Sequence, residues 1–151
     1  MQCAARPNAQ LRLQHFCAIR APRDVDKDMH VSHPPTGTRV LIVEDDTIIA
    51  MTAEDMLDEV GCKTAAVAGT VAEALARAGD TEFDIALLDL NLRDENSLPV
   101  AQRLRDDGKR FIFATGYDGL PPGSGFADAP VISKPYRLEQ LALIIAQTLQ
   151  G

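Results

Sequence analysis

The chain of 151 residues, with 46% apolar and 25% charged side chains, has the composition of one folded domain with a core. Its formal net charge of -7 argues against nucleic acid as a direct partner, because binding there depends on Lys and Arg. No apolar stretch is long enough to span a bilayer, so we expect no membrane insertion. The cysteines Cys3, Cys17 and Cys62 lack both metal-ligand spacing and the pattern of a disulfide framework, which indicates a reducing, cytoplasmic compartment.

The first 36 residues differ from the rest of the chain. Basic residues outnumber acidic ones there, and no sustained hydrophobic periodicity is present. We interpret residues 1–36 as a disordered or misassigned N-terminal extension, with Met29 as an alternative start, and residues 37–151 as the folded domain. A targeting segment is the alternative interpretation, but the apolar face that it would need is thin.

Five short apolar runs follow, and each predicts a buried strand. They lie at residues 39–43, 63–67, 85–88, 111–114 and 131–133. Helical patterns separate the first four runs, and another closes the chain at residues 138–149. Between the fourth and fifth runs, Gly and Pro crowd residues 118–130, so we expect a short, irregular or mobile element in place of a helix.

The boundaries of the helices have their own signals. The first helix should end at Gly61, and its predicted inner face comprises Ile49, Ala53, Met56 and Val60. A capping box at residues 70–73 starts the second helix, and Ser97 is the predicted N-cap of the third.

Alternation of strands and helices implies parallel pairing with right-handed crossovers. The predicted fold class is therefore α/β, a doubly wound five-stranded parallel sheet with helices on both faces and the flavodoxin-like strand order 2-1-3-4-5. Such sheets carry their sites outside the carboxyl ends of the strands.

Polar residues follow four of the five predicted strands. Three acids follow the first strand, and single residues follow the third, fourth and fifth: Glu44, Asp45, Asp46, Asp89, Thr115 and Lys134. Clustered carboxylates without His or Cys suit a hard cation such as Mg²⁺. A cation, an ammonium and a hydroxyl around one carboxylate suit the arrival of a phosphoryl group, with Asp89 as the covalent acceptor. Taken singly, each residue has a simpler explanation; Asp45 or Asp46 could merely cap the next helix.

The segments that carry these residues together resemble a response-regulator receiver domain of two-component signalling. The motifs lie at residues 43–46, 87–92, 114–116 and 133–136, and the resemblance extends from about residue 39 to residue 149. The chain is most similar to the single-domain receivers that have a Phe-Ala-Thr-Gly-x-Tyr-like motif. Here that motif reads Phe-Ala-Thr-Gly-Tyr at residues 113–117, without a residue between Gly and Tyr.

The resemblance implies a role for each motif residue. Asp89 would accept a phosphoryl group from the phosphohistidine of a sensor histidine kinase, and Thr115 and Lys134 would bind the phosphoryl oxygens. Mg²⁺ would be held by a set of five residues: Asp45 and Asp89 directly, Asn91 through its carbonyl, Glu44 through water, and Asp46 as an addition. The resemblance also implies a cis Lys134–Pro135 peptide, no activity beyond the domain's own phosphorylation and dephosphorylation, and a downstream phosphotransfer or anti-sigma-type partner.

The sequence departs from the family pattern in three places. Val131 stands where receivers usually carry an aromatic switch residue, a role that Tyr117 or Tyr136 would have to take over. Ser97 or a neighbour stands where many receivers have glycine, and the Gly/Pro-rich segment replaces a helix. Because segments that change order are a known switching device, we expect residues 118–128 to read out phosphorylation.

Other functions fit the sequence less well. A phosphorylation-independent adaptor with the same fold remains the alternative, supported by Val131 alone. A hydrolase with an aspartyl-phosphate intermediate would need a second acid where Asn91 stands, and an amide cannot transfer the proton. A nucleotide site would need a Gly-rich loop after the first strand, where three acids stand instead. We expect a receiver without an output domain to act by binding a partner.

Overall fold

The structure of the protein is a computed structural model that describes residues 32–116 and 119–151. The predicted extension at residues 1–36 therefore lies mostly outside the described residues, and its boundary stays a prediction. At that boundary, the Gly37 N–H donates to the Gly61 carbonyl at 2.7 Å, and the Thr38 hydroxyl donates to the Pro35 carbonyl at 2.6 Å. The chain just before the first strand is thus fastened to the turn that precedes the second.

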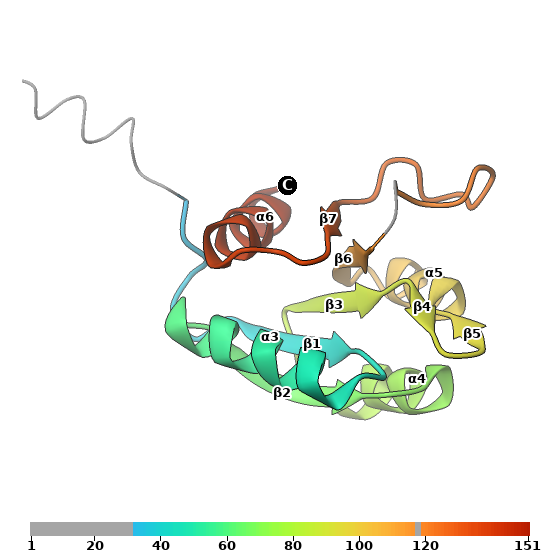
Figure 1. Ribbon diagram of the computed structural model, residues 1–151, viewed down its shortest axis with the longest axis horizontal. Coiled ribbons are helices and arrows are strands. Elements are labelled where there is room, and N and C mark those ends of the chain that lie inside the picture. Colours follow the sequence, from blue (N-terminus) through green and yellow to red (C-terminus); the bar gives the residue numbers. More distant parts are fainter. Residues whose placement is uncertain (1–31, 117–118) are drawn as a thin grey trace, which may run out of the picture. The chain divides into compact units, whose positions relative to one another are not determined.

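Five parallel strands form the main sheet, in the order β2-β1-β3-β6-β7. This order confirms the predicted fold class, because these are the five predicted strands and their order is 2-1-3-4-5. The central strand β3 lies between β1 and β6 (Figure 1), and all of its residues are buried. The bounds of the strands are β1 Arg39–Val43, β2 Lys63–Ala68, β3 Ile85–Asp89, β6 Arg110–Thr115 and β7 Val131–Ser133.

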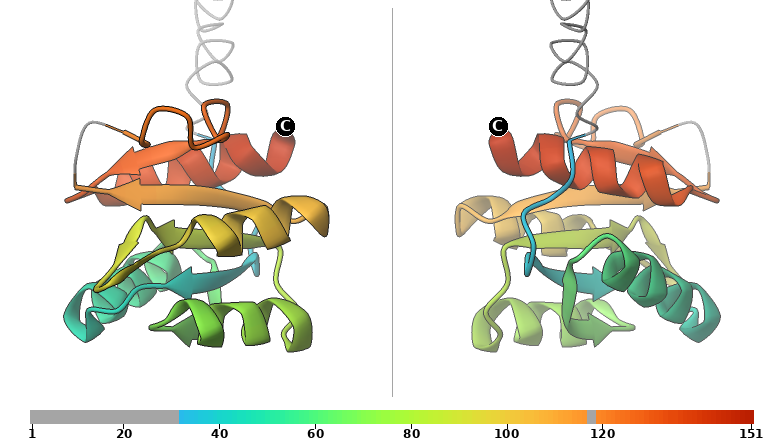
Figure 2. Two further views of the ribbon diagram at one scale, coloured as in Figure 1. Left: turned by 90° about the vertical axis from the view of Figure 1, so that its right-hand side faces the viewer. Right: turned by 90° about the vertical axis from the view of Figure 1, so that its left-hand side faces the viewer.

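Helices cover both faces of the sheet (Figure 2). Successive strand residues point to opposite faces, so Val40 and Ile42 pack on one side and Leu41 and Val43 on the other. The first side is closed by α3 and α6, and the second by α4 and α5. The bounds of the helices are α3 Thr47–Glu59, α4 Val71–Asp80, α5 Leu98–Asp106 and α6 Leu138–Gln150.

The inner face of α3 differs in part from its prediction. The buried residues are Ala50, Ala53 and Leu57, while Ile49 is 37% exposed. The cause lies in the sequence of the first turns, where apolar residues occur on every side and Ile48 is 76% exposed. Hydrophobicity therefore does not mark a single face there, and the small alanines give the helix its close approach to the sheet.

Ser97 occupies the predicted N-cap position of α5, but it does not cap the helix with its side chain. The Ser97 side chain makes no capping hydrogen bond, and Asn96 Oδ1 accepts instead from the Leu98 N–H at 3.1 Å. The Ser97 N–H donates to the Leu90 carbonyl at 2.9 Å, which holds the residue inside the fold. Its hydroxyl is fully buried and has no hydrogen-bond partner among residues 32–116 and 119–151.

Residues 119–130 contain no helix, which confirms the predicted irregular element over the part of it that the structure describes. The segment is anchored by Phe126, which is 3% exposed and packs edge-to-face on Phe111 and Phe113 at ring-centroid distances of 5.9 and 5.6 Å. The Arg105 guanidinium lies 4.2 Å from the centre of the Phe126 ring and pairs with Asp128 at 3.2 Å. One aromatic side chain with its arginine therefore does the packing that a helix would otherwise do.

Replacing Ser97 with alanine should stabilise the domain. A buried hydroxyl without a partner costs about 1 kcal/mol or more, and its removal should raise the free energy of unfolding by about 1 kcal/mol in urea titrations. The neighbouring Asn96→Ala variant serves as a control, because loss of the hydrogen bond that its side chain accepts from the Leu98 N–H should lower the free energy of unfolding by about 1 kcal/mol. A loss of stability in Ser97→Ala would contradict the assignment of an unsatisfied hydroxyl.

Candidate functional site

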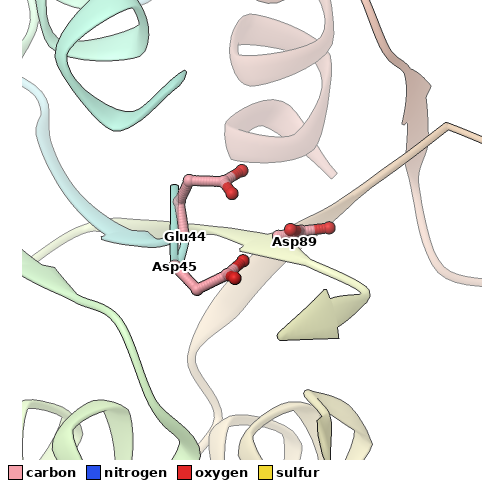
Figure 3. Close-up of side chains that lie close together, drawn as sticks. All are labelled: Glu44, Asp45 and Asp89. Carbon is pink, nitrogen blue, oxygen red and sulfur yellow. The ribbon is translucent and has the colours of Figure 1, made fainter. Parts of the chain in front are cut away.

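Three carboxylates meet at the carboxyl edge of the sheet. Glu44 and Asp45 directly follow β1, and Asp89 is the last residue of the neighbouring strand β3. Because Val43 pairs with Leu88, the two strands end side by side. One oxygen from each carboxylate lies within 4.8 Å of the other two, and Figure 3 shows the three side chains grouped at the strand ends.

The counter-charge comes from the other side of the site. Lys134 directly follows β7, which lies two strands away from β3, and its N–H donates to the Thr115 carbonyl at 2.8 Å. The ammonium lies 2.5 Å from Glu44 Oε2 and 3.2 Å from Asp89 Oδ2. The peptide between Lys134 and Pro135 is cis, as the resemblance implied.

Burial and these contacts shift the pKa of two groups. The pKa of Glu44 is raised, first by burial and then by the negative charge of Asp89, and the hydrogen bond from Lys134 offsets this only in part. Burial by itself lowers the pKa of Lys134, but the hydrogen bond to Glu44 and the charge of Asp89 outweigh burial and raise it. The ammonium is therefore firmly charged, while negative charge remains in excess around it.

Thr115 and Asn91 flank Asp89 from two directions. Thr115 is buried at the end of β6, whose preceding residue Ala114 pairs with Asp89. The Asn91 N–H donates to Asp89 Oδ1 at 3.3 Å and so helps to orient the carboxylate. Of the two tyrosines predicted to take over the switch role, Tyr136 is partly buried against the core on the side of α3 and α6, and Tyr117 lies outside the described residues.

The side chain of Asp46 caps the helix that follows β1. Its Oδ1 accepts from the N–H groups of Ile48 and Ile49 at 2.9 and 3.2 Å, which makes it the N-cap of α3. The structure thus separates the two acids for which the sequence left capping open: Asp46 caps the helix, and Asp45 joins the carboxylate cluster. A contribution of Asp46 to a metal site stays a prediction.

A small hairpin after β3 was not predicted. It comprises β4 Asn91–Leu92 and β5 Glu95–Asn96, which pair antiparallel. In its turn, Arg93 has a φ of 49° and places its Nε 3.4 Å from Asp45 Oδ2. Two-residue strands carry no periodic signal, so sequence reasoning missed this second cation at the acidic cluster.

The donor set fits a hard divalent cation. The three carboxylates supply oxygen ligands only, and they lie close enough to share one ion. Lys134 contacts two of them and carries a single positive charge, so negative charge remains for a cation to balance. Mg²⁺ accepts one or two protein carboxylates together with water and phosphate oxygens, so the residues present fit a magnesium site.

Residues 40–146 match the family model of the response regulator receiver domain, and the chain belongs to that family. Members of this family are signalling domains rather than classical enzymes. None of the helices in the described part of the chain is long and apolar enough to cross a membrane.

Individual relatives add detail. The chain is similar to the solution structure of SdrG from Sphingomonas melonis Fr1, with 41% identity, a TM-score of 0.67, and coverage of 76% of this chain and 98% of that one. The receiver domain of PhyR from Erythrobacter litoralis is 25% identical with a TM-score of 0.69, covering 76% and 92%. The sensory transduction protein LytR of Staphylococcus haemolyticus is 29% identical over 107 residues, or 68% of this chain. The alignment spans only 42% of LytR.

Tyr136 should make the stability of the domain sensitive to alkali. Burial, followed by the charges of Glu44 and Asp89, raises the pKa of its phenol to about 12. The folded state thus holds this proton more tightly than the unfolded chain, so the contribution is complete below about pH 10 and is lost as the pH rises through about 12. The raised pKa of Lys134 acts in the same direction.

Urea unfolding at a series of alkaline pH values measures this dependence. The free energy of unfolding should fall more steeply with pH in the wild type than in Tyr136→Phe, whereas at neutral pH the phenol is uncharged in both folded and unfolded states. Equal slopes for the two proteins would show that neither burial nor the carboxylates raise the pKa of this phenol.

Proposed function

We propose that the protein is a response regulator whose receiver domain accepts a phosphoryl group on Asp89 from the phosphohistidine of a sensor histidine kinase and signals by binding other proteins. The observation that carries the proposal is the setting of Asp89. Its carboxylate lies within 4.8 Å of two other acids, and its Oδ2 lies 3.2 Å from the Lys134 ammonium. A carboxylate between an acidic cluster and a fixed cation is suited to nucleophilic attack on phosphorus.

In the transfer step, an oxygen of Asp89 forms a bond to phosphorus while the bond between phosphorus and the kinase imidazole breaks. The electron pair of that broken bond leaves with the imidazole. Lys134 would bind an oxygen of the transferred group, since its ammonium already contacts Asp89 Oδ2 and carries a stabilised charge. Thr115, at the end of β6, would donate its hydroxyl to another oxygen.

Asp45, Asp89 and the carbonyl of Asn91 would hold Mg²⁺ directly, with Glu44 acting through water. The ion would supply charge neutralisation for the phosphoryl oxygens during transfer. The protein itself supplies the rest, because it orients Asp89 through the Asn91 N–H and keeps Lys134 at the carboxylate.

Intact-mass measurement after incubation with acetyl phosphate tests the proposal. The wild type should gain one phosphoryl mass in the presence of Mg²⁺ and none without it, and Asp89→Asn should gain none. Lys134→Ala should slow the reaction on the order of 100-fold, because a positioned charge is lost from the transition state. The matched control is Asp80→Asn, an exposed aspartate at the far end of α4, which should behave as the wild type.

If no adduct is found, a second experiment is needed, because an acyl phosphate can hydrolyse before its mass is measured. Beryllofluoride mimics the phosphoryl group, and one similar structure, at 38% identity, is the beryllofluoride-activated conformation of SdrG from Pseudomonas melonis Fr1. Resonances near Thr115 should shift when beryllofluoride and Mg²⁺ are added. No adduct and no shift would overturn the phosphoacceptor role and favour the phosphorylation-independent adaptor, the alternative for which Val131 speaks.

Read-out of the phosphoryl group should fall on the irregular segment at residues 119–130, which contains the described part of the predicted read-out region at residues 118–128. Phe126 is the one fully buried large side chain of this segment, and its backbone makes few hydrogen bonds, such as those from Ser124 to Pro121 and from Ala129 to Phe126. Weakly held segments open at low free-energy cost and respond first to a new charge. We propose that the segment forms the contact for a downstream phosphotransfer or anti-sigma-type protein.

Hydrogen exchange with and without beryllofluoride measures this response. Amides of residues 119–130 should change their exchange rates, whereas those of the buried strand β3 should not. Asp89→Asn, which cannot be activated, is the control and should show no difference. Unchanged exchange in the segment, together with shifted resonances at Thr115, would place the read-out elsewhere.

A further inference from the structure

The three carboxylates of the site are divided between two cations. Lys134 contacts Glu44 and Asp89, and Arg93 contacts Asp45 at 3.4 Å. The Arg93 side chain is 78% exposed and that of Asp45 is 20% exposed, so the guanidinium reaches from solvent to the mouth of the cluster. Lys134 sits inside the fold, whereas Arg93 can leave without disturbing packing.

The hairpin that carries Arg93 is fixed at both of its ends. At its start, the Asn91 N–H donates to Asp89 Oδ1 at 3.3 Å. At its end, Glu95 Oε2 accepts from the Val71 N–H at 3.4 Å, which ties the hairpin to the first turn of α4. The position of Arg93 is therefore set by the fold, and only its long side chain is free to move.

We infer that Arg93 competes with the divalent cation for the carboxylate of Asp45. This inference rests on the proposed function. An ion bound at the cluster needs an oxygen of the Asp45 carboxylate, and the guanidinium already pairs with that carboxylate through Oδ2. A guanidinium does not lose its proton in proteins, so Arg93 can yield only by swinging into solvent. Metal loading then has to displace a built-in counter-ion, which lowers the affinity of the site for Mg²⁺.

The competition between Arg93 and Mg²⁺ for Asp45 affects signalling. Because Asp45 exchanges Arg93 for Mg²⁺ before transfer, phosphorylation of Asp89 reaches half of its maximum at a higher free Mg²⁺ concentration than the carboxylates alone would require. The guanidinium of Arg93 also loses its partner, and becomes available at the surface of the hairpin, only when Mg²⁺ is bound.

Direct titration with Mg²⁺ tests the inference, with calorimetry or NMR shifts as the readout and without any phosphodonor. Arg93→Ala and Arg93→Gln should bind Mg²⁺ about two- to five-fold more tightly than the wild type, the range expected for an exposed ion pair. Arg93→Lys keeps the charge and should stay near the wild type. Arg77→Ala removes an exposed arginine that pairs with Asp80 in the last turn of α4, and it controls for net charge.

The choice of variants avoids a backbone effect. At a φ of 49°, alanine and glutamine carry the same Cβ cost as arginine, so the comparison isolates the charge. Equal affinities in the wild type and both neutral variants, or weaker binding in the variants, would overturn the inference and leave the proposed function standing. Absence of Mg²⁺ binding in every protein would overturn the proposed function and the inference with it.

Discussion

The structure depends on compensating negative charge that is buried at the carboxyl edge of the sheet. Glu44 and Asp89 are only 6% and 9% exposed, and two carboxylates at this depth destabilise a fold unless a cation meets them. Lys134 meets both, but it can do so only because β6 alone separates β3 from β7. The strand order is therefore what brings the cation to the two buried carboxylates.

Much of this arrangement follows from the sequence. Right-handed crossovers between alternating strands and helices leave few orders for five parallel strands, and the carboxyl ends of such strands meet at one edge. Residues directly after strands, such as Asp45 and Lys134, could therefore be placed together without knowing any contact. Asp89 could be singled out because an acid that closes a fully apolar strand has no role in building the core.

The sequence pattern does not show which of two adjacent polar residues makes a given hydrogen bond or contact. Ser97 stands at the N-cap position of α5, but it is the side chain of Asn96 that accepts the hydrogen bond from the Leu98 N–H. Asp46 caps α3 while its neighbour Asp45 turns to the cluster, a choice between two identical side chains. Arg93 was missed because its contact crosses from a hairpin too short to have a period.

The way residues 119–130 are attached has an evolutionary consequence. The core on the side of α4 and α5 gains from this segment chiefly the ring of Phe126, with Leu120 and Ala129 packed at its margin. Substitutions and changes of length elsewhere in the segment therefore leave both the core and the carboxylate edge untouched. A lineage of such proteins can acquire new binding partners here by drift at the exposed positions of the segment, while Asp89 and the residues around it stay under unchanged selection.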